Sequence, residues 1–197
     1  MSGQTSSQVV TFRVGDDEFA ADIMAVERVL RYMHPTPVPN LPDWVEGVLE
    51  HHGRVVPVID LARRFGVAPE SASPDRAPDG GVGRRIIIFV VGDDWIGAVV
   101  DAVLEVVVIP PELVTPPPEL FRGLSAEYLR GLVRREAPPE GTQSRTTRAG
   151  LLIFLEVQRL LSATERLVLE QAVRESPGGG AGAGGDDAGD AMTGRHV

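Results

Sequence analysis

The tetrapeptide Val-Gly-Asp-Asp occurs twice in this chain, each time within an apolar stretch. It lies first in VVTFRVGDDEFAADIMAVERVL, which begins at Val9, and again in IIIFVVGDDWIGAVVDAVLEVV, which begins at Ile86. The two stretches also match outside the tetrapeptide, at Phe12 and Phe89, Ala21 and Ala98, Ile23 and Val100, and Ala25-Val26 and Ala102-Val103. A Gly-Asp-Asp turn between two apolar strands is typical of a β-hairpin. The sequence therefore predicts a hairpin that has been duplicated within the chain.

The first strand of the first hairpin shows an alternating pattern. Val10, Phe12 and Val14 recur at every second position, which is the period of a half-buried strand. On the next strand, Phe19 and Ala21 are expected to point inward in the same way. Each hairpin is thus predicted to bury one face in a core.

The similarity continues downstream of the hairpins. The segment WVEGVLEHHGRVVPVIDLARRF, from Trp44, has a counterpart in YLRGLVRREAPPEGTQSRTTRAGLLIFLEVQRLL, from Tyr128. In each copy a strand, a loop and a second strand lead into a short helix, expected at Leu61–Phe65 and at Val157–Leu161. Two repeats of short strands, separated by Gly and Pro, predict a mainly β fold of two small antiparallel barrels or sandwiches. A duplication of this kind commonly packs as a pseudo-two-fold pair with a shared apolar seam.

The segments outside the repeats have simple interpretations. Ser162 followed by Glu165 is a capping box, which predicts a C-terminal helix over residues 163–174. Segments rich in Gly, Pro and polar residues cannot bury much apolar area, so they are expected to be mobile or disordered. These segments are residues 1–7, 67–84, 136–149 and 176–197.

Composition excludes several classes of function. The formal net charge is −9, which argues against nucleic acid as a main partner because phosphates attract basic surfaces. The chain has no cysteine, which excludes disulfides, thiol catalysis and Cys-ligated zinc. The first residues, MSGQTSSQ, lack the pattern of a signal peptide, and Gly97, Asp101 and Glu105 interrupt the longest apolar stretches. We therefore expect a soluble cytoplasmic protein that does not insert into membranes.

The ordered set of motifs resembles the CheW family, the coupling proteins of bacterial chemotaxis-type signalling. The strongest matches are G-V-x-x-x-x-G-x-V-x-P-V-x-D-L at Gly47–Leu61 and G-x-x-V-D-x-V at Gly97–Val103. The resemblance covers roughly residues 8–173 and suggests a CheW-like domain over residues 8–174. It implies two five-stranded SH3-like barrels with an apolar groove between them. We expect the first barrel at about residues 8–66, with a chain crossover to the second at about 85–161.

The resemblance also implies a function without catalysis or a cofactor. CheW-like proteins connect the cytoplasmic tip of methyl-accepting chemoreceptors to the regulatory domain of a CheA-type histidine kinase. Where the family motif usually reads Asn-Leu-Arg-Gly, this chain has Glu50-His51-His52-Gly53, so His52 replaces an Arg that helps to form the receptor contact. Histidine lacks the forked set of hydrogen-bond donors of the arginine guanidinium, and unlike arginine it is not permanently charged. The residues expected at the receptor contact are Arg28, Glu50, His52 and Arg54, with Val26, Val29 and Val48 as the apolar part of the same patch.

Two alternative functions stay open at this point. The replaced motif suggests an adaptor that binds only the kinase in a divergent pathway. A small metal-dependent hydrolase using Glu50, His51 and Asp60 is the other alternative. Against a metal site, adjacent residues on a strand point to opposite faces, so His51 and His52 are not expected to bind one ion together.

Two aspartates and one valine stripe have both structural and functional interpretations. Asp60 and Asp101 follow apolar strands, where a carboxylate can act as a catalytic acid, yet capping of the following helix or turn is the favoured interpretation. No nucleotide-binding motif accompanies either aspartate. The stripe is expected to form core or seam and, at its open edge, a groove floor for a partner helix. Its members are Val99, Val100, Val103, Val106 and Val108.

Overall fold

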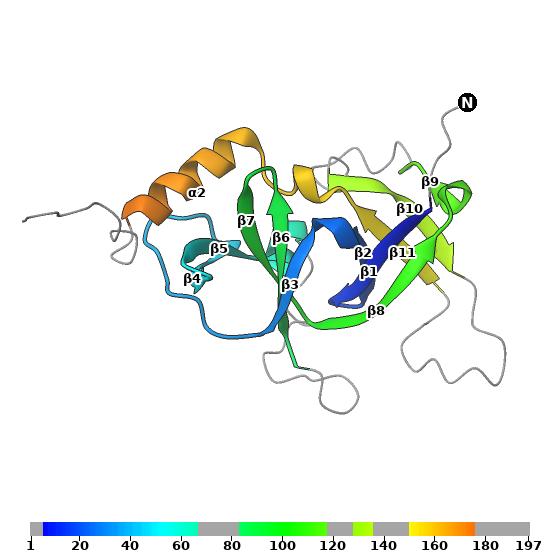
Figure 1. Cartoon of the computed structure of the whole chain (residues 1–197), viewed down its shortest axis with the longest axis horizontal. Coiled ribbons are helices and arrows are strands. Elements are labelled where there is room, and N and C mark those ends of the chain that lie inside the picture. Colours follow the sequence, from blue (N-terminus) through cyan, green and yellow to red (C-terminus); the bar gives the residue numbers. More distant parts are fainter. Residues whose placement is uncertain (1–5, 67–82, 118–127, 136–149, 176–197) are drawn as a thin grey trace, which may run out of the picture.

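The computed structural model describes residues 6–66, 83–117, 128–135 and 150–175. Within these ranges the strands form a five-stranded sheet of order β3-β6-β7-β5-β4 and a six-stranded sheet of order β8-β1-β2-β11-β10-β9 (Figure 1). The strands are β1 (Ser7–Val14), β2 (Asp17–Asp22), β3 (Val26–Arg31), β4 (Val45–His51), β5 (Arg54–Asp60), β6 (Arg85–Val91), β7 (Asp94–Val100), β8 (Ala102–Ile109), β9 (Val114–Thr115), β10 (Leu129–Arg135) and β11 (Gly150–Leu155). We call the five-stranded sheet the first barrel and the six-stranded sheet the second barrel.

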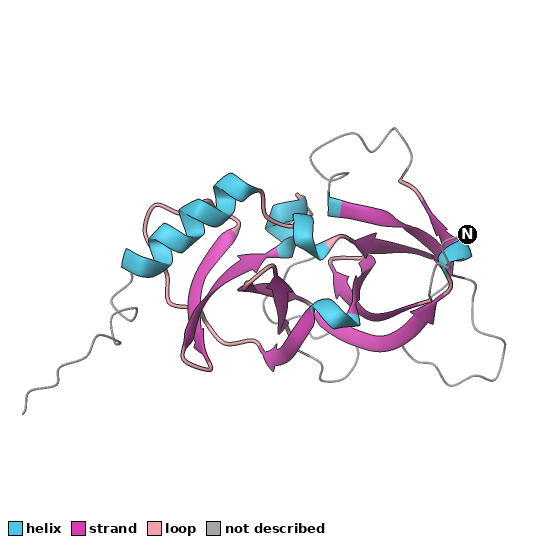
Figure 2. Cartoon of the chain, turned by 45° about the horizontal axis from the view of Figure 1, so that its top comes forward, coloured by secondary structure: helices cyan, strands magenta, loops and turns pink. Residues whose placement is uncertain are grey.

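Helices are a minor part of the fold (Figure 2). In the described ranges they are η1 (Ile23–Ala25), α1 (Leu61–Phe65), η2 (Pro111–Leu113), η5 (Val157–Arg159) and α2 (Ala163–Glu175). The mainly β fold with two subdomains is therefore confirmed. Among the described residues, none of these helices is long and apolar enough to cross a bilayer. The expected disordered tails, the connection at 67–84 and the loop at 136–149 lie mostly outside the described residues.

The two barrels exchange their hairpins, which corrects the expected barrel boundaries of 8–66 and 85–161. Strand β2 of the first hairpin pairs in parallel with β11, which belongs to the second copy. In return, β7 of the second hairpin pairs in parallel with β5 of the first copy. Each barrel thus combines the hairpin of one repeat with the downstream strands of the other.

Burial on both faces explains why the hairpins lie between the two halves. The expected inward residues Val10, Phe12 and Val14 are buried, but so are Val9 and Thr11 on the other face of β1. The prediction of a half-buried strand was therefore wrong. A strand that is apolar on both faces must be covered on both, as in the strands of sheets that lie between two layers.

In both barrels a short segment closes the barrel by packing its backbone against a glycine. Thr36, which follows β3, forms a bridge to Val48 in β4, with backbone N–O distances of 2.8 and 2.9 Å. In the second barrel, Thr115 of β9 pairs with β10 in the same way. A Cβ added to Gly47 would lie 2.2 Å from the Thr36 carbonyl oxygen, and one added to Gly131 would lie 2.9 Å from the Thr115 oxygen. The glycine repeated in the two motifs is thus what lets the closing segment reach the barrel.

The duplication extends to individual hydrogen bonds. The Asp60 amide donates to the Trp44 carbonyl at 2.8 Å, and the Glu156 amide donates to the Tyr128 carbonyl at 2.8 Å. The register of β4 against β5 and that of β10 against β11 also shift at corresponding positions, just before the repeated glycine. The correspondence that the sequence indicated between Trp44 and Tyr128 therefore holds at the level of backbone geometry.

The buried apolar side chains of the described segments form three clusters, one between the barrels and one inside each barrel. The central cluster joins the barrels, and in it the rings of Phe12 and Phe89 lie 6.3 Å apart. The interior cluster of the first barrel consists of Leu49, Val56, Val58, Ile86 and Val99. That of the second barrel consists of Val9, Ala20, Ile109, Val133, Leu152 and Phe154. The expected seam between two small cores is therefore present, and it is larger than either interior.

Helix α2 is fixed to the body of the molecule by a buried arginine. The predicted capping box is formed, because the Glu165 amide donates to Ser162 Oγ at 3.2 Å and the Ser162 amide donates to Glu165 Oε2 at 2.8 Å. Arg64 of α1 donates to both Glu165 oxygens, at 2.6 and 2.9 Å, and to the Tyr128 hydroxyl at 2.7 Å. Its guanidinium also lies 4.3 Å from the centre of the Trp44 ring. Through Arg64, helix α2 is therefore linked to Trp44 and Tyr128, the equivalent aromatic residues of the two copies.

The glycine approach gives a stability prediction. Gly47→Ala places a methyl group on a backbone carbonyl at a φ of 144°, so it should reduce the free energy of unfolding by about 3 kcal/mol or more. Gly131→Ala should cost less, because the φ of Gly131 is not positive and its backbone contact, the Thr115 carbonyl oxygen at 2.9 Å, is less close than that of Gly47. Gly150→Ala, which meets nothing within 4 Å, is the control. Urea unfolding that ranks the three variants otherwise contradicts this account.

Candidate partner-binding site

The tip of the β4–β5 hairpin is a tight turn with an unusual backbone. Both central residues have positive φ angles, 51° at His52 and 72° at Gly53, as a type I′ turn requires. Strand pairing closes the turn between His51 and Arg54. His52 is therefore presented outward by the turn and does not lie on the strand.

An aromatic side chain from the neighbouring strand supports this tip. Trp95 of β7 has its ring 5.6 Å from that of His51 and 6.5 Å from that of His52. The Arg54 guanidinium lies 4.7 Å from the centre of the Trp95 ring, within the range of a cation–π contact. Trp95 thus holds two histidines and an arginine in one group, and the sequence-based site prediction did not include it.

His51 is the buried member of this group. It is 9% exposed, and its Nε2 atom makes no hydrogen bond within the described structure. Burial lowers the pKa of His51 below its usual value, and the nearby His52 and Arg28 lower it further, against an opposing effect of Glu27. These effects also place Glu27 and Arg28 of β3 close to the tip, because the barrel closes β3 toward β4.

The four polar residues expected at the receptor contact all belong to the first barrel. Arg28, Glu50, His52 and Arg54 are all exposed, on β3, β4, the turn and β5. We call these four side chains the tip surface. The tip and its supporting tryptophan lie in the first barrel.

The three valines expected beside them differ in exposure. Val29 is exposed on β3, and Val26 is half-buried and packs against the central cluster. Val48 is 6% exposed and pairs with Thr36, so the expectation that it supplies contact surface is corrected. It is a wall residue of the barrel because the closing segment covers it.

The histidines also differ from their expected arrangement. The rings of His51 and His52 lie 4.3 Å apart, so the argument that they point to opposite faces was wrong, because His52 belongs to the turn. In the part of the chain that the structure describes, no three His, Cys, Asp or Glu side chains form a group that could hold a metal ion. Glu50, His51 and Asp60 are therefore not gathered into one such group.

The two aspartates have structural roles. Asp60 accepts a hydrogen bond from the Arg63 amide at 3.1 Å, which confirms the predicted cap of the following helix. Its other oxygen accepts from Arg84 at 3.3 Å. Asp101 accepts a hydrogen bond from the Gly15 amide at 2.6 Å. It therefore holds the turn of the first hairpin, whereas the sequence predicted that it would cap the segment that follows it. Burial raises the pKa of Asp101, against the lowering effect of this hydrogen bond and of Arg84.

The valine stripe divides into a buried and an exposed part. Val99 and Val100 are buried and Val103 packs against the central cluster, as expected of a seam. Val106 and Val108 lie farther along β8 on the second barrel, and both are exposed. The stripe therefore leaves the seam and ends on the surface.

The buried histidine predicts a pH-dependent stability. Because folding lowers the pKa of His51, the unfolded chain binds its proton more readily, so this residue should reduce stability as the pH falls below about 6.5. His51→Leu removes both the titration and the unpaired Nε2, and should raise the free energy of unfolding by about 1 kcal/mol at pH 8. The gain should increase between pH 7 and pH 5, measured by urea unfolding. Parallel stability curves for the two proteins contradict this assignment.

Comparisons with known proteins agree with this fold. A family model described as the CheW-like domain matches residues 8–165. The chain is similar to a chemotaxis protein CheW of Treponema pallidum, with 30% identity over 158 residues, covering 80% of this chain and 84% of the relative. It is also similar to protein FrzA of Myxococcus xanthus, with 34% identity over 129 residues, covering 66% of this chain and 75% of the relative.

A solved structure shares the fold. The scaffolding protein TtCheW from Thermoanaerobacter tengcongensis superimposes with a TM-score of 0.63 at 24% identity, over 82% of this chain and 96% of that one. The family model matches 158 of the 197 residues, which is most of the chain. The chain belongs to the CheW-like family.

Proposed function

We propose that this chain is a cytoplasmic, non-catalytic scaffold that couples methyl-accepting chemoreceptors to a CheA-type histidine kinase. Membership of the CheW-like family over residues 8–165 is the observation that carries this proposal. The related solved protein is itself titled a scaffolding protein. Two small barrels with separate exposed surfaces suit a protein that holds two partners at once.

The tip surface is the proposed receptor contact. Its two arginines, one glutamate and one histidine come from β3, β4, the β4–β5 turn and β5 of the first barrel, and Val29 of β3 adds an exposed apolar side chain. Mixed charge of this kind sets the orientation of a partner more than it adds affinity. An interface of about 1,200 Å² or less is typical of transient signalling contacts, so binding is expected to be weak and strengthened by multivalency in an array.

The second barrel offers a separate surface for the kinase. Val106 and Val108 of β8 and Leu113 of η2 are 49%, 62% and 50% exposed. Side chains at alternate positions of one strand share a face, so the two valines form part of one apolar patch. Exposed apolar patches commonly mark protein contacts. We assign the regulatory domain of the kinase to this patch, leaving the tip surface for the receptor.

Coupling requires no chemistry from this chain. A scaffold shifts the activity of a kinase when it binds one arrangement of receptor and kinase better than another. The central cluster and the Arg64 contacts fix the two barrels and α2 relative to one another. A rigid body can therefore transmit the position of the receptor to the kinase.

Charge reversal tests the two assignments separately. Arg28→Glu should weaken binding to a receptor cytoplasmic fragment by about five-fold or more, while leaving binding to the kinase regulatory domain unchanged. Arg159→Glu makes the same change of charge at an exposed residue of η5 and is the control. Affinities measured by microscale thermophoresis decide the outcome. If Arg28→Glu and the control behave alike toward the receptor, the tip surface is not the contact.

The replacement of the family's arginine by His52 favours a second candidate function, an adaptor that binds the kinase alone. His52→Arg distinguishes the two. A clear gain in receptor binding supports the coupling protein. If neither the wild-type chain nor His52→Arg binds a receptor fragment while both bind the kinase, the second candidate stands.

A further inference from the structure

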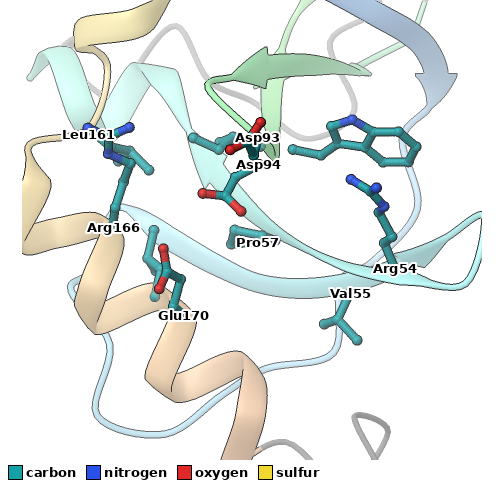
Figure 3. A pocket seen from close by; sticks show the side chains of 11 residues that line it. Arg54, Val55, Pro57, Asp93, Asp94, Leu161, Arg166 and Glu170 are labelled. Carbon is teal, nitrogen blue, oxygen red and sulfur yellow. The ribbon is translucent and has the colours of Figure 1, made fainter. Parts of the chain in front are cut away.

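A groove of about 570 Å³ lies between α2 and the strands β5 and β7 of the first barrel (Figure 3). Its floor is apolar and includes Val55, Pro57, Trp95, Leu161 and Leu169. Its rim carries five charged side chains, Arg54, Asp93, Asp94, Arg166 and Glu170. We call this feature the α2 groove. An apolar floor below charges of both signs is the composition of a protein-binding groove, with a desolvated centre and a polar rim.

The rim charges are arranged along the groove and do not pair with one another. Figure 3 shows Arg166 and Glu170 on α2 at one side, Arg54 at the opposite end, and Asp93 and Asp94 between them. No salt bridge joins any two of these five side chains within the described part of the chain. The charges are therefore available to groups of opposite sign on a partner.

The walls of the groove are held in place before any partner binds. The β6–β7 turn is fixed by Gln158, whose Oε1 accepts from the Gly92 amide at 3.0 Å and whose Nε2 donates to the Val90 carbonyl at 3.0 Å. The opposite wall, α2, is fixed by the Arg64–Glu165 ion pair. A preformed groove binds with a smaller entropy cost than one that must be ordered.

The occupant cannot be an added β-strand. Strand β7 is already paired with β6 and β5, and β5 is already paired with β7 and β4. Neither strand has a free edge along the groove, so a partner must bind through side chains. A helix laid into an apolar groove is a common mode of this kind, because an amphipathic helix places its apolar face on the floor and its polar residues at the rim.

The groove is continuous with the tip surface. Arg54 belongs to both, and Trp95 on the groove floor also contacts the rings of His51 and His52. A partner that covers the tip surface therefore reaches the groove entrance without a gap. This continuity favours the receptor over the kinase, whose proposed patch lies on the other barrel.

We propose that the α2 groove is a second part of the receptor contact and receives a helix of the receptor's cytoplasmic tip. The apolar stripe of that helix lies on Trp95 and Leu169, a basic residue faces Asp93 and Asp94, and an acidic residue faces Arg54 or Arg166. This inference rests on the proposed function, since it adds to the receptor contact at the tip. On this proposal Trp95 determines specificity in both the tip surface and the α2 groove.

The experiment reverses rim charges in the full-length chain. Asp93→Lys and Arg166→Glu should each weaken binding to a receptor cytoplasmic fragment by about five-fold, without changing thermal stability. Asp16→Lys is a matched control, because Asp16 occupies the same place in the first Gly-Asp-Asp turn. Arg159→Glu is the control for the arginine. Kinase binding should be unchanged in all four variants.

The absence of cysteine allows a direct measurement of contact. Glu170→Cys and Asp16→Cys can each carry one environment-sensitive fluorophore. Receptor fragment should shift the emission at position 170 and leave that at position 16 unchanged.

The outcomes separate this inference from the proposed function. If Arg28→Glu weakens receptor binding while the groove variants and the fluorophore at position 170 do not respond, the groove inference is wrong and the proposed function stands. If groove variants weaken kinase binding alone, the groove belongs to the kinase and the inference is again wrong. If the wild-type chain binds no receptor, both proposals are wrong.

Discussion

Burial of the two hairpins on both faces is the constraint on which the rest of this structure depends. Val9 of β1 fills the interior of the second barrel while Phe12 of the same strand lies in the central cluster. Ile86 and Phe89 of β6 divide in the same way between the first barrel and the central cluster. Neither barrel has a complete interior without a hairpin from the other repeat. The duplicated chain must therefore fold as one cooperative unit, although it contains two barrels.

That interdependence is what makes a small β protein useful as a rigid connector. Residues from both repeats meet at Arg64, which contacts the aromatic side chains of Trp44 and Tyr128 and the carboxylate of Glu165. Hydrogen bonds from Arg64 and Ser162 hold the pKa of Glu165 below its usual value although burial would raise it, so the carboxylate stays charged at neutral pH. Surfaces on the two barrels and on α2 consequently keep fixed relative positions.

Local rules predicted the local structure, and long-range packing decided the rest. The capping box at Ser162, the cap at Asp60 and the repeated hairpins depend on residues close in sequence, so the sequence predicted them. The exchange of hairpins depends on what covers the second face of β1, and an alternating pattern of valines does not reveal it. The prediction missed Trp95 for a similar reason. Trp95 lies on β7, which is far from the β4–β5 hairpin in sequence and becomes its neighbour only in the folded sheet. The prediction considered only the β4–β5 hairpin.

The two repeats have diverged at equivalent positions, and this divergence gives the barrels different surfaces. By the alignment of the copies, His51 corresponds to Arg135 and Trp95 corresponds to Glu18. His51 and Trp95 form an aromatic contact, with ring centroids 5.6 Å apart, while Arg135 and Glu18 form an ion pair at 3.2 Å. The same backbone positions thus carry an aromatic, histidine-containing group in one barrel and an ionic one in the other. A partner that needs an apolar platform flanked by charge therefore distinguishes the two barrels, despite their common fold.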